Sequence, residues 1–507
     1  MRPMATRAAM RHKLTDEQNA AALSSAVRTF VEAGPGTGKT TVAAARFGCI
    51  RYSQPVASSR GVVAVSFTVA ATQELRSRTT GRWGRAALDA PSRVCTIDRE
   101  LTDILCWLLR RELIVWPNGL TTIDPLDSCD THPSWKYDGD PRHQTWQPDL
   151  VGGAVQPVQA DMSGSRRITQ KDLLTLLKQG ICSHEDVRRI VRSALANPEL
   201  RASVIEHRQA TIAHFIVDEV FDADVLDLDL IRLHCEAGIP TTVAGDQWQA
   251  LYDFRKAVPG EVAAAIDQLG FKHAPIERSH RFAEPHLERL AVELRQGGCT
   301  VPVLAEGMAV DVVLGRWWQH LWDGPDWVLP LSFGGDIDNA TDAIIALLVD
   351  HVTHEKLNLR SRARDDALTR LNATTDEVVA WADGLSAVLR LLTDTSEAVA
   401  IQALAELRRC TTATPGRRAV RKLVGDKERA AVSRIQAIAA RLVCPAELVK
   451  GLTAHQAKGR QWKTVGLCVL DTDVAAIESG LDINNPDHRA LYVALTRASH
   501  GSGRVQT

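Results

Sequence analysis

The sequence predicts an α/β protein with parallel β-sheets that carry helices on both faces. Short apolar strands alternate with helical stretches along most of the chain, which is typical of parallel sheets buried on both sides. Several strands end at an acidic or glycine-rich turn, and 45% hydrophobic with 24% charged residues is ordinary globular composition. A length of 507 residues allows about three domains of roughly 150 residues each.

The expected strands follow one another in a regular order. The first, at 28–33, leads into a glycine-rich turn and a helix, and the second, at 61–67, leads into a helix rich in Ala, Gln and Arg. Later strands are expected at 214–217, 240–245 and 464–470, and an acidic residue directly follows each of them. This repeated order of strand, turn and helix favours parallel strand pairing.

Two stretches interrupt that order. Residues 117–168 are rich in Pro, Asp, Gly and isolated Trp, and we interpret them as an irregular insertion. Residues 374–447 are dominated by Ala, Leu, Arg and Glu, and their pattern predicts a small helical insertion.

Charge and hydropathy exclude several classes of protein. Lys and Arg number 60 against 61 Asp and Glu, so any polyanionic partner must meet a local positive groove. The longest apolar run, 343–349, is far shorter than the roughly 20 residues of a membrane span, and no secretory signal is visible. The ten cysteines form no Cys-x-x-Cys pair. We therefore expect no membrane partner and a cytoplasmic protein with reduced thiols.

A glycine-rich turn between the first strand and its helix predicts a phosphate-binding loop. Ala33 stands where the general pattern has Gly, so the match depends on the residues after it. Lys39 can reach the β and γ phosphates, and Thr40 supplies a hydroxyl for Mg²⁺. The expected ATP-binding residues of this loop are Gly34, Pro35, Gly36, Thr37, Gly38, Lys39, Thr40 and Thr41.

Asp218 and Glu219 follow the strand at 214–217 and supply the second half of such a site. A carboxylate at a strand end can hold Mg²⁺ through water, and its neighbour can polarise the attacking water. We therefore expect Thr40 and Asp218 to bind the metal and Glu219 to be catalytic.

Further segments, in order along the chain, resemble the motifs of superfamily 1 helicases of the UvrD/Rep/PcrA type. They span 14–18, 66–71, 218–222, 245–255, 277–281, 453–462 and 491–498. The resemblance implies two RecA-like core domains, each with a reduced insertion, and ATP bound between them. The expected first domain comprises 1–100 and 206–280 around an insertion at 101–205, and the expected second comprises 281–373 and 448–507 around the insertion at 374–447.

The motif residues suit roles in ATP binding and hydrolysis. The amide of Gln18 can pair with the adenine edge as donor and acceptor at once, and His280 keeps a ring that could stack on adenine. Gln249 is placed to sense the γ phosphate. The guanidinium groups of Arg281 and Arg497 suit the spread charge of a phosphoryl transition state.

Aromatic residues in these motifs are candidates for stacking on nucleic-acid bases, which tolerates any sequence. Phe67, Tyr252 and Phe254 are such candidates, with Arg255 nearby, and core packing is the alternative for each aromatic ring. The resemblance adds Thr68, Thr453 and His455 as DNA contacts.

Some positions depart from the family pattern. Phe221 stands where the motif at 218–222 usually has Gln. Gln461 stands where the motif at 453–462 usually has Glu, and His280 replaces the usual Tyr of the motif at 277–281. The missing Gln removes one polar link between the ATP site and the motif at 245–255. Only nine residues follow Ala498, so we expect no fused nuclease domain. The compact layout is similar to helicase-like subunits of phage-defence systems such as Gabija.

The sequence thus leaves two functions open, both with ATP and Mg²⁺. The first is a DNA translocase or helicase, 3′-to-5′ by resemblance, acting on single-stranded DNA or tailed duplex. The second is a DNA- or nucleotide-sensing ATPase that regulates a partner nuclease with little unwinding. A nucleotide kinase would not explain the later motifs.

Overall fold

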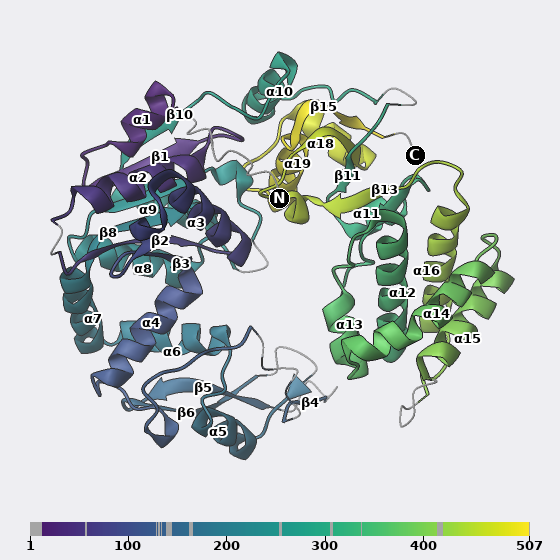
Figure 1. Ribbon diagram of the computed structural model, residues 1–507, viewed down its shortest axis with the longest axis horizontal. Helices are drawn as coiled ribbons and strands as arrows, with labels where there is room; N and C mark the ends of the chain where they lie inside the picture. Colours follow the sequence, from purple (N-terminus) through teal and green to yellow (C-terminus); the bar gives the residue numbers. More distant parts are fainter. Residues whose placement is uncertain are drawn as a thin grey trace, which may run out of the picture. The chain divides into compact units, whose positions relative to one another are not determined.

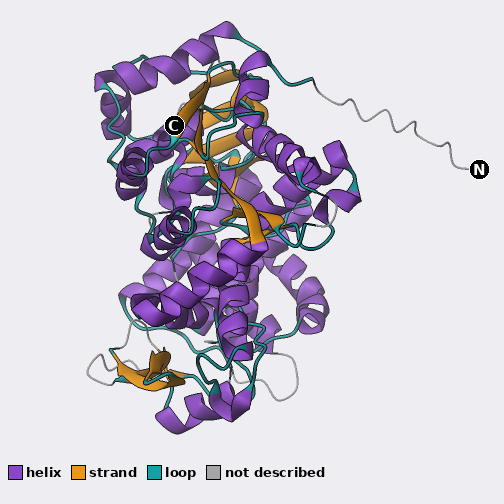
Figure 2. Ribbon diagram, turned by 90° about the vertical axis from the view of Figure 1, so that its left-hand side faces the viewer, coloured by secondary structure: helices purple, strands orange, loops and turns teal. Residues whose placement is uncertain are grey.

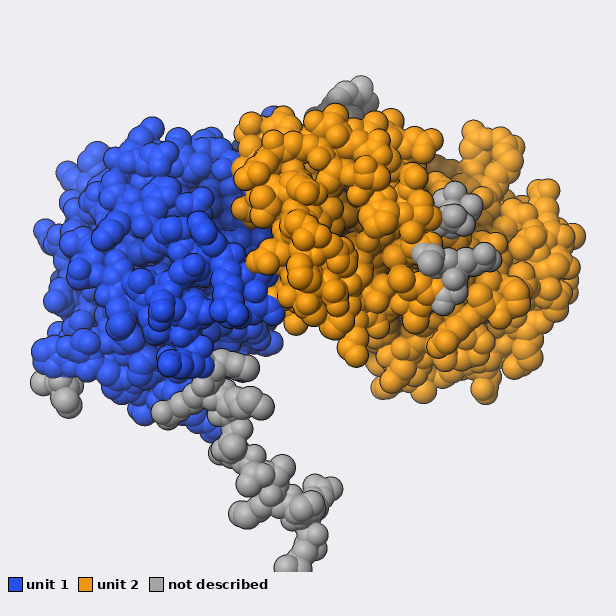
Figure 3. All heavy atoms as spheres, turned by 90° about the horizontal axis from the view of Figure 1, so that it is seen from above, with its two compact units in different colours: residues 1–280 blue, residues 281–507 orange. Residues whose placement is uncertain are grey.

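The computed structural model describes residues 13–505, except 56–57, 128, 130–131, 133, 138–143, 162–165, 253–255, 305–307, 336 and 413–418. The chain separates into two compact units, residues 1–280 and 281–507, coloured separately in Figure 3. Each unit is built on its own parallel sheet. Figure 2 shows many of the strands lying among helices, with a smaller group of strands at the lower edge of the view.

The sheet of unit 1 has six strands in the order β10-β1-β9-β8-β2-β3 (Figure 1), and every pairing is parallel. The strands are β1 (Arg28–Ala33), β2 (Gly61–Ser66), β3 (Arg93–Thr96), β8 (Ile212–Asp218), β9 (Thr241–Gly245) and β10 (Lys272–Ile276). Strands β1, β9 and β8 are consecutive in the sheet. Their carboxyl ends carry the phosphate loop, Asp246 and the acidic pair, respectively.

Both faces of this sheet are buried under helices. On one face Val62 and Ala64 pack with α2 (Lys39–Ser53) and α3 (Val69–Trp83), and Val31 of β1 packs with α1 (Asp16–Ala22) and α2. On the other face Val63 and Val65 join the core of α4 (Ile97–Arg110), α8 (Val225–Glu236) and α9 (Pro259–Gln268). Because side chains alternate along a strand, a strand buried on both faces must be apolar throughout, as β2 is.

The insertion in unit 1 contains α5 (Gln170–Lys178), α6 (His184–Ala196), α7 (Pro198–Thr211) and four strands. The short strands β4 (Lys136–Tyr137) and β7 (Arg166–Arg167) pair with each other, as do β5 (Thr145–Val151) and β6 (Ala154–Ala160). The β5–β6 hairpin corrects our expectation of an irregular stretch. Pro148 faces Pro157 across it, which hides the strand pattern, although Gly152 and Gly153 both have positive φ, as a tight hairpin turn requires.

The sheet of unit 2 has five parallel strands in the order β12-β13-β11-β14-β15. They are β11 (Val312–Gly315), β12 (Val328–Pro330), β13 (Val449–Thr453), β14 (Trp462–Cys468) and β15 (Ala498–Arg504). The associated helices are α10 (Pro285–Gln296), α11 (Trp318–Trp322), α17 (Ala454–Ala457), α18 (Asp471–Ser479) and α19 (Pro486–Leu495). Two parallel sheets with flanking helices confirm the predicted α/β class of RecA-like domains.

A helical part of unit 2 packs around α12 (Ala340–Leu357), which buries the apolar run 343–349. Its other helices are α13 (Arg364–Leu371), α14 (Thr375–Leu391), α15 (Glu397–Thr412) and α16 (Asp426–Val443). Among the described residues no helix is both long and apolar enough to span a membrane.

Candidate active site

The phosphate loop connects β1 to α2, and its backbone requires glycine. Gly36 and Gly38 have φ of 73° and 92°, in the region that L side chains rarely adopt. A Cβ on Gly38 would also lie 2.8 Å from Nε2 of Gln18. Gly38 is the N-cap of α2 and brings no side chain to cap it. The first N–H groups of α2 are thus suited to an anion, and the helix dipole adds to that preference.

The Lys39 side chain lies inside the loop. It is buried, and its Nζ donates to the Ala33 carbonyl at 3.4 Å. This bond is long, so a phosphate oxygen can replace the carbonyl as the partner of the ammonium group at little cost. Lys39 therefore occupies the position that the loop sequence predicts.

Neighbouring segments hold the loop through its carbonyl groups. Gln18 Nε2 donates to the Thr37 carbonyl at 2.8 Å, Ser279 Oγ donates to Pro35 O at 2.8 Å, and the His280 N–H donates to Gly36 O at 2.9 Å. The loop shape is thus set by α1 and by the segment after β10.

Gln18 differs from its expected adenine-binding role in one respect. Its Nε2 is bonded to the loop, and its Oε1 accepts the Thr15 N–H at 3.1 Å. Both ends of the amide are therefore engaged within the protein, and a bidentate adenine contact would require both bonds to be given up. In this structure Gln18 acts as a support for the loop.

Asp218 ends β8 as a fully buried carboxylate. Neither of its oxygens accepts a hydrogen bond of ordinary geometry from the described residues. Burial and the neighbouring Glu219 charge raise the pKa of Asp218, while the nearby Thr40 hydroxyl and Lys39 ammonium favour its charged form. A buried, unpaired carboxylate beside a hydroxyl is an oxygen donor set that fits Mg²⁺.

Mg²⁺ fits this site better than a metal held by protein groups alone. In the parts of the chain that the structure describes, no group of three or more His, Cys, Asp or Glu side chains is arranged to hold a metal ion. Mg²⁺ keeps several waters and needs only one or two protein oxygens together with substrate phosphates. Thr40 and Asp218 are sufficient for that mode of binding.

Glu219 has a strained backbone. Its φ of 61° and ψ of 43° are left-handed, which costs a non-glycine residue about 1 kcal/mol. The residue begins the 3-10 turn η3 (Val220–Asp222). Strain of this kind is retained where a side chain must be aimed, which supports the expected catalytic role of Glu219.

Phe221 forms an apolar contact where the family pattern has a polar one. The ring is buried and meets Phe30 edge-on at 6.0 Å between centroids. It also covers Gly245 at the end of β9, where an added Cβ would be 2.7 Å from the Phe221 ring. Phe221 thereby joins the turn of Glu219 to the strand that leads into Asp246.

Gln249 is positioned by Asp246, a residue that sequence reasoning missed. Gln249 is buried in η4 (Gln247–Gln249), and its Nε2 donates to Asp246 Oδ2 at 2.6 Å. The other Asp246 oxygen accepts the Trp248 N–H at 3.2 Å. An acid directly after a strand and three residues before Gln249 was the available signal.

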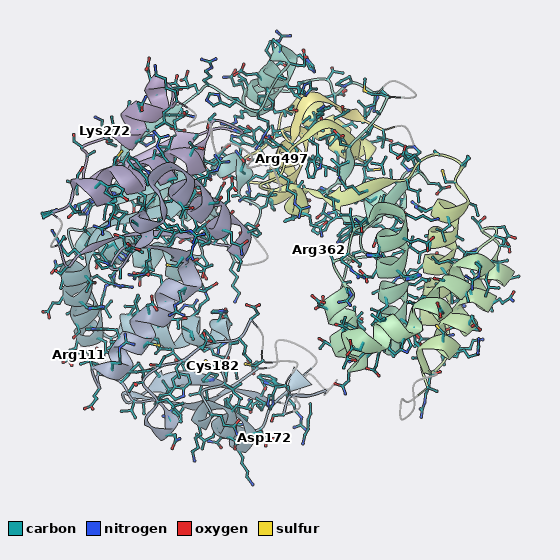
Figure 4. All side chains as sticks on the ribbon, viewed as in Figure 1. Arg111, Asp172, Cys182, Lys272, Arg362 and Arg497 are labelled. Atoms are coloured by element: carbon teal, nitrogen blue, oxygen red, sulfur yellow. The ribbon has the colours of Figure 1, made fainter. Side chains whose placement is uncertain are left out.

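Arg281 and Arg497 both belong to unit 2, and the structure brings them to the same helix end. Arg281 Nη1 donates to Thr496 O at 2.8 Å, and Arg497 Nε donates to Val493 O at 3.0 Å, at the end of α19. Arg497, labelled in Figure 4, is 1% exposed. The carboxyl end of a helix favours cations, so α19 holds a pair of oriented guanidinium groups.

The expected DNA contacts of unit 1 are only partly described. Phe254 and Arg255 lie outside the described residues, and Tyr252 is partly buried. Phe67 is buried within the main core cluster, which favours the packing alternative over base stacking. Thr68 caps α3, because its Oγ1 accepts the Ala71 N–H at 3.1 Å.

In unit 2, Thr453 and His455 lie at the carboxyl end of β13. Thr453 is buried and is the N-cap of α17, and His455 on α17 is partly exposed. Thr453 thus has a clear structural role in addition to the predicted contact, while His455 presents part of its ring to solvent.

A protein-family model described as an AAA domain matches residues 17–255. The matched stretch contains Gln18, the phosphate loop, the acidic pair and Gln249, so it covers the site built above. The fold and this match point to a P-loop ATPase of helicase type. The matched stretch is similar to a helicase-like family that is related to UvrD and Rep. No curated protein matches the sequence.

Proposed function

We propose that this chain is an ATP-driven translocase on single-stranded DNA that moves 3′-to-5′. Two observations carry the proposal: unit 1 holds a phosphate loop with a buried acidic pair, and unit 2 holds two arginines oriented by carbonyl groups at the end of α19. A P-loop enzyme with a small acceptor substrate would not explain the later motifs, to which both arginines belong. The direction of movement comes from the resemblance alone.

Each residue has a defined task in the proposed reaction. Lys39 binds the β and γ phosphates, and Thr40 and Asp218 hold Mg²⁺, which neutralises charge on the phosphoryl oxygens when bound. Glu219 accepts a proton from the attacking water, and Gln249, held by Asp246, lies next along the same sheet edge. The motor requires Arg281 and Arg497 to reach the transferred phosphoryl group in the nucleotide-bound state.

Two assays, streptavidin displacement from single-stranded DNA and unwinding of tailed duplexes, test the proposal. Displacement of streptavidin from biotinylated single strands measures movement, and unwinding of 3′-tailed and 5′-tailed duplexes measures helicase activity. We expect ATP-dependent displacement from the 3′ end, none from the 5′ end, and none with Lys39→Ala. Displacement from neither end by an ATP-hydrolysing protein would contradict translocation.

One observation favours a second function, a DNA-sensing ATPase that regulates a partner nuclease in phage defence. Phe221 replaces a polar link of the ATP site by packing on Gly245, and an apolar contact lacks the directionality of a hydrogen bond. That function predicts DNA-stimulated ATP hydrolysis without movement, so the displacement assay separates the two.

A further inference from the structure

An aromatic pair lies at the carboxyl edge of the unit 2 sheet. Strands β11 and β13 are parallel neighbours, with Gly315 paired to Thr453 at their ends. Trp317 and His455 each lie two residues beyond these paired positions, so the backbone places them side by side. Their ring centroids are 6.5 Å apart with an angle of 34° between the planes.

The Trp317 ring faces solvent, although the residues around it are well packed. Trp317 is 52% exposed, whereas Trp322 on the following helix is 6% exposed. The ring of Trp318 lies against Gly334, where an added Cβ would be 2.5 Å away. Tryptophan combines a large apolar ring with a polar N–H, which suits it to binding surfaces.

A cation also lies in the segment after His455. Arg460 follows His455 in the loop after α17, and its side chain is exposed. Arg316, next to Trp317 in the chain, is bound to Asp487 at 2.9 Å and Asp473 at 3.4 Å. Those ion pairs anchor the backbone that carries the ring. An exposed arginine in the same segment as an exposed aromatic ring suits a nucleic-acid strand, whose phosphates and bases need both.

We propose that Trp317, supported by His455, is a base-stacking platform for single-stranded DNA on unit 2. The proposal rests on the proposed function and adds a residue that the sequence motifs do not mark. Every base has a π face, so a stacking platform of this kind serves all sequences equally.

Binding of a fluorescein-labelled oligo(dT) to the full chain without nucleotide, followed by anisotropy, tests the platform. Trp317→Ala removes one stacking ring and should therefore weaken the affinity for oligo(dT) about five- to hundredfold. Trp317→Phe should retain most of the affinity, and Trp317→Leu should behave like the alanine variant, because it keeps apolar area without a π face. Thermal unfolding should be close to that of wild type in all three, since the ring is exposed.

Tyr52→Ala is the matched control. Tyr52 is 53% exposed at the end of α2 in unit 1, away from the carboxyl edges of either sheet, and its loss should leave DNA binding within twofold of wild type. Oligonucleotides containing 2-aminopurine add a direct readout, because stacking on Trp317 should quench the base, and Trp317→Leu should remove part of that quenching.

The outcomes separate the two proposals. If wild type binds oligo(dT) and its ATPase responds to it, but Trp317→Ala binds within twofold of wild type, the platform is wrong and the proposed function stands. Equal affinities of the leucine and wild-type proteins would likewise contradict stacking. If wild type does not bind single-stranded DNA at all, the proposed function fails and the platform with it.

Discussion

Glu219 shows at the scale of one residue how backbone and chemistry combine. Its left-handed conformation is costly for glutamate and natural for glycine. The strain remains because the residue is held between a buried strand and a 3-10 turn that packs on the core. The sequence motif predicts a carboxylate here, but only the structure reveals that it is held at a strained position.

Substitution of Glu219 separates catalysis from strain. Glu219→Gln should bind ATP as wild type does and slow hydrolysis at least a hundredfold in single-turnover assays, because the attacking water loses its base. Glu219→Gly should be more stable than Glu219→Ala by about 1 kcal/mol in denaturant unfolding, since both lack the carboxylate and only glycine relieves the strain. Wild-type hydrolysis by the glutamine variant would contradict the assignment.

Asp218 provides a second test at this scale. Its buried carboxylate has no hydrogen bond of ordinary geometry from the described residues, and Lys39 and Thr40 offset only part of its desolvation, so Asp218→Asn removes an unfavourable buried charge. We expect the Tm without nucleotide to rise by a few degrees at pH 8, and Mg²⁺-dependent ATP hydrolysis to be lost. A Tm several degrees lower would mean that the carboxylate stabilises the fold.

Residue types could be predicted at the site, but their contacts could not. The loop glycines, Lys39, the acidic pair and Gln249 follow from spacing, because phosphate chemistry limits the residues that can serve. The turn of the Gln18 amide toward Thr37 depends on a contact between separate segments, whereas the bond from Gln249 to Asp246 is local and only its spacing was visible. A single sequence does not contain that information.

At the scale of elements, the link between Phe221 and Gly245 joins two parts of the ATP site. A Cβ at position 245 would be 2.7 Å from the Phe221 ring and 3.0 Å from Val220. The turn after β8 and the end of β9 are therefore fitted to each other by packing.

A double-mutant cycle tests this link. Gly245→Ala should lower the free energy of unfolding by about 1–3 kcal/mol through overpacking. In a Phe221→Leu background the same change should cost less, because the smaller side chain leaves room for the methyl group. Equal costs in both backgrounds would show that Phe221 and Gly245 are not coupled.

The elements themselves were predictable to different degrees. The buried strands β1, β2, β8 and β9 were visible as apolar runs bounded by turns. The β5–β6 hairpin was missed because Pro148 and Pro157 break the alternation on which strand prediction depends. Its two-glycine turn was the remaining signal.

At the scale of the whole molecule, two parallel-sheet units each contribute one part of the proposed motor. Unit 1 holds the phosphate loop and the acidic pair, and unit 2 holds Arg281 and Arg497. The fold class was predictable from the alternation of strands and helices. The gathering of both arginines at the end of α19 was not, because they are separated by more than two hundred residues.

Removal of either arginine should impair hydrolysis far more than binding. We expect Arg281→Ala and Arg497→Ala to keep ATP affinity within about tenfold and to lower the hydrolysis rate roughly a thousandfold or more. Arg497→Lys should not restore activity, since an ammonium group cannot make the forked contact to two oxygens. Equal losses of affinity and rate would instead indicate a structural role at α19.

The central claim is that ATP hydrolysis by this chain is coupled to single-stranded DNA, and steady-state ATPase measurement tests it most directly. The purified full chain is assayed with Mg²⁺, with and without oligo(dT), beside Lys39→Ala. We predict Mg²⁺-dependent hydrolysis that rises at least tenfold with DNA and disappears in the lysine variant. A rate unchanged by DNA, or equal in wild type and Lys39→Ala, would contradict the account.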